Sequence, residues 1–316
     1  MNYLRAKKLL FILFLMHGAQ LYCVDESRSA TVLRFLYQNA AGRVVRSFIT
    51  RNGYFSAFTG WLANRSASKY IIPTFIKQYR DQINMNEALK PDIKSYKTFN
   101  KFFKRKLKPE CRPIDSAIDS ITSPADGKIY AIEQLNEQTE FLVKGKSFNV
   151  TQLLGGKNSG LSADTYKNGT MIIVYLAPWN YHRFHFPVDC AAKKAQVISG
   201  AYESVNRIAY QFGIQPLTEN ERHLIQLDHS DIGKIAFIPV GALCVGKIKE
   251  KYDPEKELHK KGDQAGYFEF GGSTIVMLFP ENTITLDERL KNTATQPLEI
   301  KVGERIATII KKNERP

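Results

Sequence analysis

The sequence predicts an α+β protein in which a helical segment precedes a mostly antiparallel β domain. Apolar residues recur three or four positions apart from about residue 30 to residue 89, which is the period of an amphipathic helix. After Pro113 the pattern changes to short β-type runs separated by Gly, Asn and Asp, as in strands joined by turns. We expect three parts: an apolar segment over residues 1–24, a helical module over residues 25–110 and a β core over residues 111–316.

The apolar segment resembles either a signal peptide or a short anchor. Arg5, Lys7 and Lys8 precede a run of eight apolar residues, 9–16. A helix needs about 20 apolar residues to cross a bilayer, so this run is too short to span one. It fits the basic and apolar regions of a signal peptide, and equally a retained membrane-associating segment.

The helical module carries all of the excess positive charge. The chain of 316 residues has a formal charge of +14; residues 1–110 hold 20 Lys and Arg against 6 Asp and Glu, whereas residues 111–316 hold 25 of each. Aromatic residues such as Phe55, Phe58 and Trp61 are interleaved with the basic ones. Such a surface suits nucleic acid or an anionic membrane, and the apolar N-terminal run favours the membrane. The alternative is a helical bundle whose basic face is merely solvated.

Local patterns predict the remaining elements. A helical stripe over residues 99–107 should end at Pro109, because proline is incompatible with a helix interior. Short helices are expected at residues 150–154 and 203–212, and residues 301–306 have the pattern of a strand, a turn and a strand. Strands are expected at residues 127–132, 141–143, 171–176, 235–240 and 274–279.

The cysteines argue against a disulfide framework and against a zinc knuckle. Cys23, Cys111, Cys190 and Cys244 are far apart in the sequence, and none belongs to a CxxC motif. We expect ordinary buried thiols.

Ser273 follows a pair of glycines, Gly271 and Gly272, at the start of a strand-forming run. A glycine pair in such a pattern usually marks a β-bulge or a close approach of two backbones. In the second interpretation the serine takes part in chemistry, because glycine leaves the preceding peptide bond uncrowded. The motif alone leaves both open.

Two histidines and one aspartate are further candidates for chemistry. His182 and His185 lie three residues apart just after an expected strand, and a neutral imidazole is a good acid–base catalyst near pH 7. They could instead be structural, and no further ligand lies at a persuasive spacing for a metal, so we expect none. Asp126 precedes Gly127, which is typical of a turn, but it could also orient a histidine. Asp126, His185 and Ser273 could thus form a Ser–His–Asp set.

Three segments together resemble the signature motifs of phosphatidylserine decarboxylase proenzymes. They are Ser-Pro-Ala-Asp-Gly at residues 123–127, Tyr-His-Arg-Phe-His-Phe-Pro at 181–187 and Phe-Gly-Gly-Ser-Thr at 270–274. Each motif alone is weak, but three in the right order with matching intervals are specific. The resemblance runs from about residue 94 to the C-terminus. Supporting segments follow the same order at residues 99–103, 112–115, 144–148, 220–222 and 240–242.

The resemblance implies a proenzyme that cleaves itself between Gly272 and Ser273, giving a β chain of residues 1–272 and an α chain of residues 273–316. His185, held and charged by Asp126, would take the proton of the Ser273 hydroxyl, whose oxygen attacks the preceding carbonyl. Elimination and hydrolysis would then leave a covalent pyruvoyl cofactor in place of Ser273.

The resemblance also implies the reaction and its setting. The pyruvoyl group would form a Schiff base with phosphatidylserine, and loss of carbon dioxide would yield phosphatidylethanolamine, with His182 as the candidate proton donor. Its partners would be the lipid, an anionic membrane surface and its own two chains, with no nucleic acid; a homo-oligomer is left open. We expect a peripheral enzyme of the inner cell membrane. The alternatives are a pyruvoyl decarboxylase of a soluble amino acid, which needs no basic helical module, and a non-catalytic lipid-binding protein.

Overall fold

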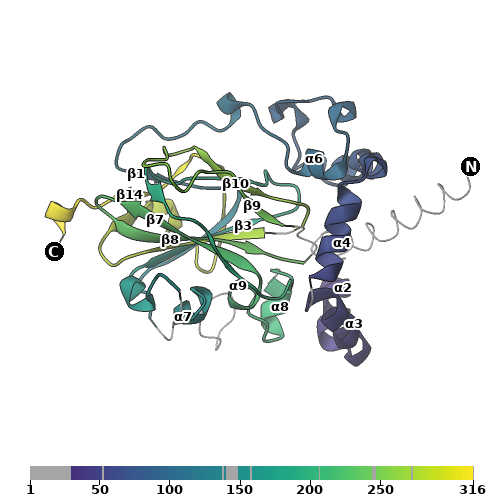
Figure 1. Ribbon diagram of the computed structural model, residues 1–316, viewed down its shortest axis with the longest axis horizontal. Helices are drawn as coiled ribbons and strands as arrows, with labels where there is room; N and C mark the ends of the chain where they lie inside the picture. Colours follow the sequence, from purple (N-terminus) through teal and green to yellow (C-terminus); the bar gives the residue numbers. More distant parts are fainter. Residues whose placement is uncertain are drawn as a thin grey trace, which may run out of the picture.

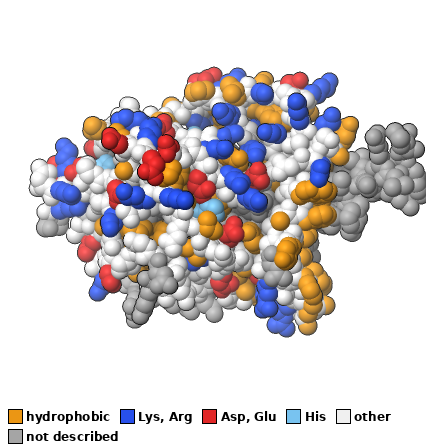
Figure 2. All heavy atoms as spheres, viewed as in Figure 1, with side chains coloured by type: hydrophobic (Ala, Val, Ile, Leu, Met, Phe, Trp, Pro, Cys, Tyr) orange, Lys and Arg blue, Asp and Glu red, His pale blue; other side chains and the backbone are white. Residues whose placement is uncertain are grey.

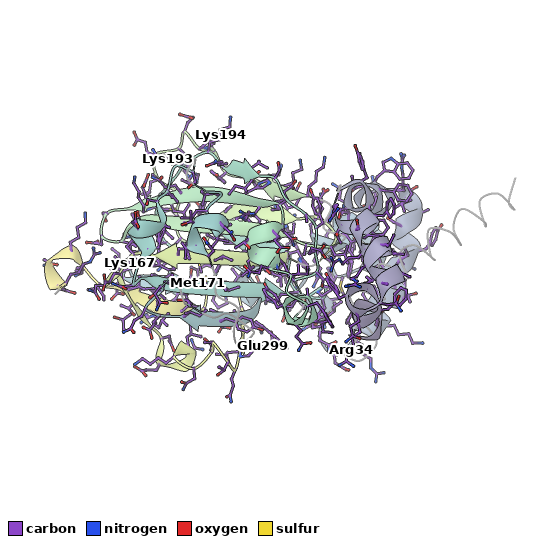
Figure 3. All side chains as sticks on the ribbon, turned by 90° about the horizontal axis from the view of Figure 1, so that it is seen from below. Arg34, Lys167, Met171, Lys193, Lys194 and Glu299 are labelled. Atoms are coloured by element: carbon purple, nitrogen blue, oxygen red, sulfur yellow. The ribbon has the colours of Figure 1, made fainter. Side chains whose placement is uncertain are left out.

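The fold places the helical module at one end of a β core. The computed structural model describes residues 30–51, 53–136, 139, 149–156, 159–205, 207–243, 247–271 and 273–315. The apolar segment and the strand expected at residues 141–143 lie outside these residues. Helices α2, α3 and α4 stand beside one end of the β core in Figure 1, and the C-terminus lies at the other end. Figure 3 gives the same arrangement from below, with Arg34 labelled on α2.

The helices of the module are short and amphipathic. Side chains cap several of them; for example, Asn39 accepts a hydrogen bond from Ala41 N before α3, and Thr98 accepts one from Lys101 N before α6. The module consists of α2 (Ala30–Gln38), α3 (Ala40–Thr50), α4 (Tyr54–Ala63), η2 (Ser66–Ile71), α5 (Ile72–Gln78), η3 (Met85–Glu87), η4 (Ile93–Ser95), α6 (Phe99–Phe103) and η5 (Pro109–Cys111). No helix in the part of the chain that the structure describes is long and apolar enough to cross a bilayer.

The helix expected over residues 99–107 ends earlier than predicted, at Phe103. The chain after α6 turns back and pairs with an earlier segment instead: Leu89 N donates to Lys106 O, and Lys108 N donates to Glu87 O. Backbone hydrogen bonds to residues 87–89 thus replace helical ones. A tertiary partner of this kind is not visible in a local pattern.

The β core contains an eight-stranded antiparallel sheet, which confirms the predicted α+β class. Two three-stranded sheets accompany it. The first consists of β1 (Ser120–Thr122), β14 (Arg305–Ile309) and β12 (Ile284–Leu286). The second consists of β4 (Arg183–His185), β10 (Gln264–Phe268) and β9 (Ile248–Glu250). The order in the large sheet is β13 (Leu298–Ile300), β2 (Gly127–Ile132), β3 (Thr170–Leu176), β11 (Ser273–Phe279), β8 (Gly233–Gly241), β7 (Arg222–His229) and β5 (Ala191–Ala192), with β6 (Gln196–Ile198) also paired to β7.

Strands β2, β3, β8 and β11 confirm four of the predicted strands, and the turn before β14 confirms the pattern at residues 301–306. The helix expected at 150–154 is present as α7 (Val150–Leu153). The one expected at 203–212 is reduced to α8 (Arg207–Gln211), because the carbonyl oxygen of Glu203 accepts hydrogen bonds from Asn220 Nδ2 and Leu243 N instead of from a helical N–H. The short helix α9 (Pro216–Glu219) was not predicted.

The central strand β11 is buried on both faces. Ile275, Met277 and Phe279 belong to the larger hydrophobic cluster, whereas Val276 and Leu278 belong to the cluster on the opposite face. Side chains of α7, α8 and α9 contribute to that second cluster, and these helices lie below the sheet in Figure 1. Burial on both faces explains why the sequence of β11 is continuously apolar instead of alternating.

A third hydrophobic cluster joins the helical module to the β core. Phe99 and Phe103 of α6 both make edge-to-face contacts with Phe270, with ring centroids 4.9 and 5.3 Å apart. Leu243 of the β core belongs to the same cluster. Helix α6 therefore packs against the segment that leads into β11 and Ser273.

Candidate active site

Ser273 is the first residue of the central strand and is fully buried. Its neighbours in the sheet are Leu176 of β3 and Gly241 of β8. Gly271, two residues before it, has a φ of 140°, which a residue with a side chain rarely adopts. Gly272 lies outside the described residues. The backbone therefore enters β11 through a conformation that requires glycine at position 271.

His182 is the imidazole in contact with Ser273. Its Nδ1 lies 3.2 Å from Ser273 Oγ, and its Nε2 lies 3.3 Å from the carbonyl oxygen of Pro178. A carbonyl oxygen can only accept, so Nε2 carries the proton and Nδ1 is left to accept from the Ser273 hydroxyl. Burial, assisted by the positive charge of Arg105, lowers the pKa of His182 to about 3. The imidazole is therefore neutral at pH 7 and presents Nδ1 as a hydrogen-bond acceptor to the serine hydroxyl.

An aromatic ring from the helical module holds His182 in place. Phe103 stacks on the imidazole, with ring centroids 3.9 Å apart and an angle of 20° between the planes. The same Phe103 contacts Phe270, so one side chain of α6 supports both the histidine and the segment before Ser273. The helical module is thus part of the site.

His185 makes different contacts. Its Nδ1 lies 2.8 Å from Gly262 O and its Nε2 lies 3.1 Å from the hydroxyl of Tyr181. Both ring nitrogens therefore have partners, the first donating and the second accepting. Burial lowers the pKa of His185, while the hydrogen bond to Gly262 and the charge of Asp126 act in the opposite direction.

Asp126 is paired with an arginine. Its carboxylate accepts a bifurcated hydrogen bond from Arg112 Nε, at 2.9 and 3.0 Å, one hydrogen bond from Arg112 Nη2 at 2.6 Å and one from Val302 N at 2.9 Å. Arg112 also pairs with Glu87 of the helical module at 2.9 Å. Among the described contacts of Asp126, none is a hydrogen bond to His185.

The structure therefore brings Ser273 into direct contact with His182. Asp126 and His185 influence each other through charge, but no hydrogen bond joins them among the described residues. The pairing of β4 with β10 explains the difference. His182 O accepts a hydrogen bond from Phe268 N, close to Ser273 along the chain, whereas His185 pairs with Gln264 further back. The two histidines are about 10 Å apart along the strand direction, at roughly 3.3 Å per residue.

Two residues of the site were not singled out from the sequence. Asn100 of α6 accepts a hydrogen bond from Phe270 N at 2.9 Å through its side-chain oxygen. Arg105 is buried beside the site and donates from Nη2 to Trp179 O at 3.1 Å. Both lie in or next to a segment that contributed to the resemblance, but an asparagine near a helix start and an arginine in a basic run are ordinary surface features.

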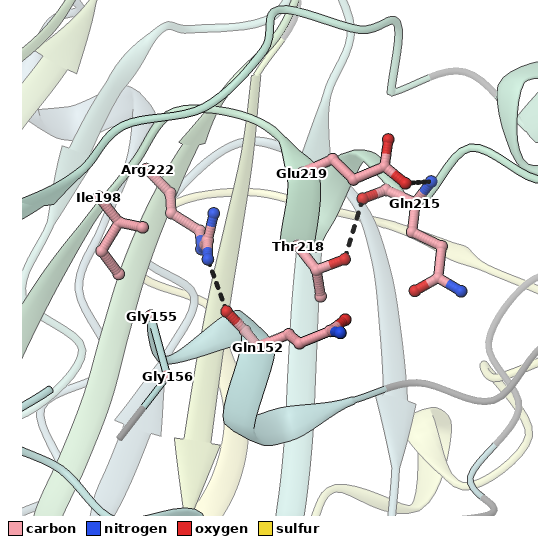
Figure 4. Close-up of a pocket in the computed structure, with 8 residues that line it drawn as sticks. All are labelled: Gln152, Gly155, Gly156, Ile198, Gln215, Thr218, Glu219 and Arg222. Carbon is pink, nitrogen blue, oxygen red and sulfur yellow. Dashed lines mark hydrogen bonds between the residues drawn. The ribbon is translucent and has the colours of Figure 1, made fainter. Parts of the chain in front are cut away.

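The pocket drawn in Figure 4 is a separate place. This pocket, of about 550 Å³, lies between α7, α9 and β6, and Ser273 does not line it. Its buried Arg222 donates to the carbonyls of Leu153, Asn220 and Gln152, so all three guanidinium nitrogens have structural partners. In the described part of the chain no three potential metal ligands cluster.

A buried hydroxyl next to a neutral imidazole, at the start of a central strand, is an arrangement suited to nucleophilic and acid–base chemistry. The fold and site thus define an enzyme whose centre is covered by an N-terminal helical module. The sequence profile described as phosphatidylserine decarboxylase matches residues 99–308. The chain belongs to the phosphatidylserine decarboxylase family.

Comparison with individual relatives gives the same family assignment. The chain is 36% identical over 259 residues to a phosphatidylserine decarboxylase proenzyme of Chlamydia pneumoniae, covering 82% of this chain and 84% of the relative. It is 34% identical over 270 residues to the proenzyme of the same name from Chlamydia trachomatis serovar L2, covering 85% and 87%. For the Fusobacterium nucleatum proenzyme the identity is 36% over 270 residues, covering 85% and 88%.

Proposed function

We propose that this chain is a proenzyme that processes itself and then converts phosphatidylserine to phosphatidylethanolamine and carbon dioxide. The relatives named above are phosphatidylserine decarboxylase proenzymes, and the chain belongs to their family. The observation that carries the proposal for the mechanism is the contact of 3.2 Å between the buried Ser273 hydroxyl and His182. It supports the interpretation of Ser273 as a reacting group over that of a residue in an inert β-bulge.

Self-cleavage between Gly272 and Ser273 needs no outside reactant except water. As an imidazole takes its proton, Ser273 Oγ bonds to the carbonyl carbon of Gly272; the C–N bond breaks and leaves an ester and a free amine. Removal of the Cα proton of residue 273 expels the Gly272 carboxylate and leaves dehydroalanine. Water then releases ammonia and leaves a ketone, the pyruvoyl group, at the start of the second chain.

We assign the first proton transfer to His185 with Asp126, as the resemblance implies. The negative charge of Asp126 favours the protonated form of His185, which is the form produced when the imidazole takes the proton. His182 is the second candidate for this step, because its accepting nitrogen faces Ser273 Oγ. Separate substitution of the two histidines distinguishes them.

The surroundings of Ser273 fit a pyruvoyl group. The position is buried, and its side-chain oxygen already faces a nitrogen that can hold or release a proton. A pyruvoyl carbonyl supplies a group that combines with the substrate amine and draws electrons from it as carbon dioxide leaves. His182 Nδ1 would take the proton that the substrate ammonium must lose, and would return it to the carbon that loses the carboxylate.

The two chains would stay together after cleavage. The second chain, residues 273–316, contributes the central strand β11, which pairs with β3 and β8. It also contributes β14, which pairs with β1, and β13, which pairs with β2. Breaking one peptide bond leaves all of these hydrogen bonds intact. We therefore retain the division into an apolar segment, a helical module and a β core that is split at Ser273.

We further propose that the helical module docks peripherally on an anionic membrane. Large apolar side chains on its helices are exposed, with Phe48 at 76% and Tyr54 at 80%. Figure 2 shows apolar groups gathered over these helices with Lys and Arg near them. Aromatic and basic groups together suit the headgroup region of a membrane. The exposed set is Phe35, Val44, Val45, Phe48, Tyr54, Phe58, Trp61 and Tyr70.

Denaturing electrophoresis with mass spectrometry tests the mechanism. We expect the purified protein to give two chains, the smaller one beginning with a pyruvoyl group at position 273, and Ser273→Ala to remain one chain. A wild-type protein that stays intact while decarboxylating phosphatidylserine would overturn the proposed origin of the cofactor.

A further inference from the structure

Arg105 has buried hydrogen-bond donors without acceptors. The residue is only 6% exposed. Its Nη2 donates to Trp179 O, but Nε and Nη1 are buried without a partner among the described residues. A guanidinium carries five N–H groups, so most of its hydrogen-bonding capacity is unused. A buried unpaired donor is unfavourable, and a buried charge without a counter-ion more so.

Two other arginines of the β core and its border, the partly buried Arg112 and the buried Arg222, are different. Arg112 is held by the carboxylates of Asp126 and Glu87. Arg222 is held by three carbonyl oxygens. Arg105 is the one of these three with a single hydrogen bond in the described part of the chain. Its unpaired donors could therefore bind an anionic ligand.

The guanidinium lies next to the reacting centre. Arg105 binds the carbonyl of Trp179, and His182 binds the carbonyl of the preceding residue, Pro178. The two side chains therefore hold neighbouring points of one backbone segment. His182 directs its other nitrogen to Ser273, and the charge of Arg105 contributes to the lowered pKa of His182, so the guanidinium and the imidazole are near neighbours. Phe103, which stacks on His182, is two residues before Arg105.

We propose that Arg105 is the residue that binds the phosphodiester of the lipid headgroup. This inference rests on the proposed function, since the substrate that it concerns is phosphatidylserine. In that lipid only a few bonds separate the reacting amine from the phosphorus atom, which matches a donor one side chain away from the centre. A guanidinium is a strong hydrogen-bond donor to phosphate oxygens, and Nε and Nη1 of Arg105 each lack an acceptor among the described residues.

The substrate carboxylate is the other anion that could be bound there, and the chemistry argues against it. The carboxylate loses its charge as carbon dioxide forms, so a guanidinium bound to it would stabilise the substrate more than the transition state. The phosphodiester keeps its charge throughout and remains in the product. Binding it anchors the lipid without opposing the reaction. Both nitrogens are covered, so neighbouring side chains must move when the lipid enters.

Product binding separates these two anions, because phosphatidylethanolamine has the phosphodiester but no carboxylate. The probes are dihexanoyl phosphatidylethanolamine and dihexanoyl phosphatidylserine below their micelle concentrations, measured by calorimetry. The protein is the full chain with Ser273→Ala, so that the result does not depend on cleavage or turnover. Arg105→Met and Arg105→Lys are compared with Lys106→Met, which removes the neighbouring exposed cation.

We expect Arg105→Met to weaken binding of both lipids by about 10- to 100-fold, the usual effect of a lost hydrogen bond to a charged group. Arg105→Lys should restore part of the affinity, and Lys106→Met should leave it unchanged. In processed enzyme, Arg105→Met should raise KM for phosphatidylserine while the chain is still cut in two. Without ligand, its melting temperature should equal or exceed that of the parent, because an unpaired buried charge has been removed.

Three results would overturn the proposal. Unchanged binding of phosphatidylethanolamine in Arg105→Met would do so. Weakened binding of phosphatidylserine alone would assign Arg105 to the carboxylate. A large fall in melting temperature, or failure of Arg105→Met to fold, would make it a structural residue. Failure of the proposed function is a separate result: wild-type protein would remain one chain and form no phosphatidylethanolamine.

Discussion

His182 and Ser273 form a buried pair in which the imidazole is fixed by a carbonyl on one side and faces the serine hydroxyl on the other. Nε2 lies 3.3 Å from Pro178 O, and Nδ1 lies 3.2 Å from Ser273 Oγ. The tautomer that the carbonyl imposes is the one that can accept the serine proton.

His182→Ala is expected to be cut normally but to decarboxylate poorly. If His182 moves the proton of the substrate, its loss should lower kcat by about 10²- to 10⁴-fold. The two measurements are the ratio of cleaved to uncleaved chain on a gel and the release of carbon dioxide from labelled phosphatidylserine. If His182→Ala stayed uncut, His182 and not His185 would be the residue that takes the first proton in processing.

His185→Ala and Asp126→Asn are each expected to block or greatly slow cleavage. Asp126→Asn also weakens the buried pair with Arg112 and should destabilise the fold by about 3 kcal/mol. Arg112→Lys is the matched control, since it disturbs the same pair but keeps the carboxylate. Cleavage should be followed at a temperature at which all variants are folded by circular dichroism. Normal cleavage in both His185→Ala and Asp126→Asn would show that neither His185 nor Asp126 is needed for processing.

Stability should fall as the pH is lowered from 7. The pKa of His182 is lowered from an ordinary value of 6.5 to about 3, so below pH 6.5 the unfolded chain binds a proton that the folded chain does not. Between pH 7 and pH 5.5 this one group should lower the free energy of unfolding by about 1 kcal/mol. His185, whose pKa is also lowered, adds to the loss.

Urea unfolding of the uncleaved Ser273→Ala protein at these two pH values measures the effect. Adding His182→Ala should make the pH dependence smaller by about 1 kcal/mol. An equal pH dependence with and without His182 would mean that this imidazole is not kept neutral by burial.

Asn100→Ala is expected to slow cleavage. Its side-chain oxygen binds Phe270 N, which fixes the backbone shortly before the bond that is cut. Loss of this buried hydrogen bond should cost about 1–3 kcal/mol and let the segment adopt unproductive positions. Lys101→Ala, at an exposed position of the same helix, is the control. The rate of appearance of the small chain after synthesis in a cell-free system is the measurement, and equal rates for the two variants would contradict the prediction.

Membrane docking is expected to depend on the exposed aromatic side chains of the helical module. Phe48→Ser with Tyr54→Ser should reduce co-sedimentation with vesicles of phosphatidylserine and phosphatidylcholine, and salt should weaken binding of the wild-type protein. Ile118→Ser is the control, because Ile118 is 95% exposed but belongs to the β core. Binding that is insensitive to both Phe48 and Tyr54 would assign the apolar face to another partner, such as a second copy of the chain.

Local patterns were sufficient for much of the fold and for the candidate residues. Strand β11 was visible because it is continuously apolar, and Ser273, His182 and Asp126 stood out as unusual residue types at strand ends. The direct partner of Ser273 was not predictable, because it depends on the register between β4 and β10, which places Phe268 opposite His182. Arg105 was hidden for a related reason: in the sequence it belongs to a basic run, and only tertiary packing buries it.

The position of Ser273 at the start of the central strand makes activity depend on correct folding. The strand must already lie between β3 and β8 before Ser273 meets His182. Under the proposed mechanism, a polypeptide that fails to assemble this sheet never makes its own prosthetic group. Only a chain that has assembled this sheet would therefore become active, and misfolded copies would have no activity on the lipid.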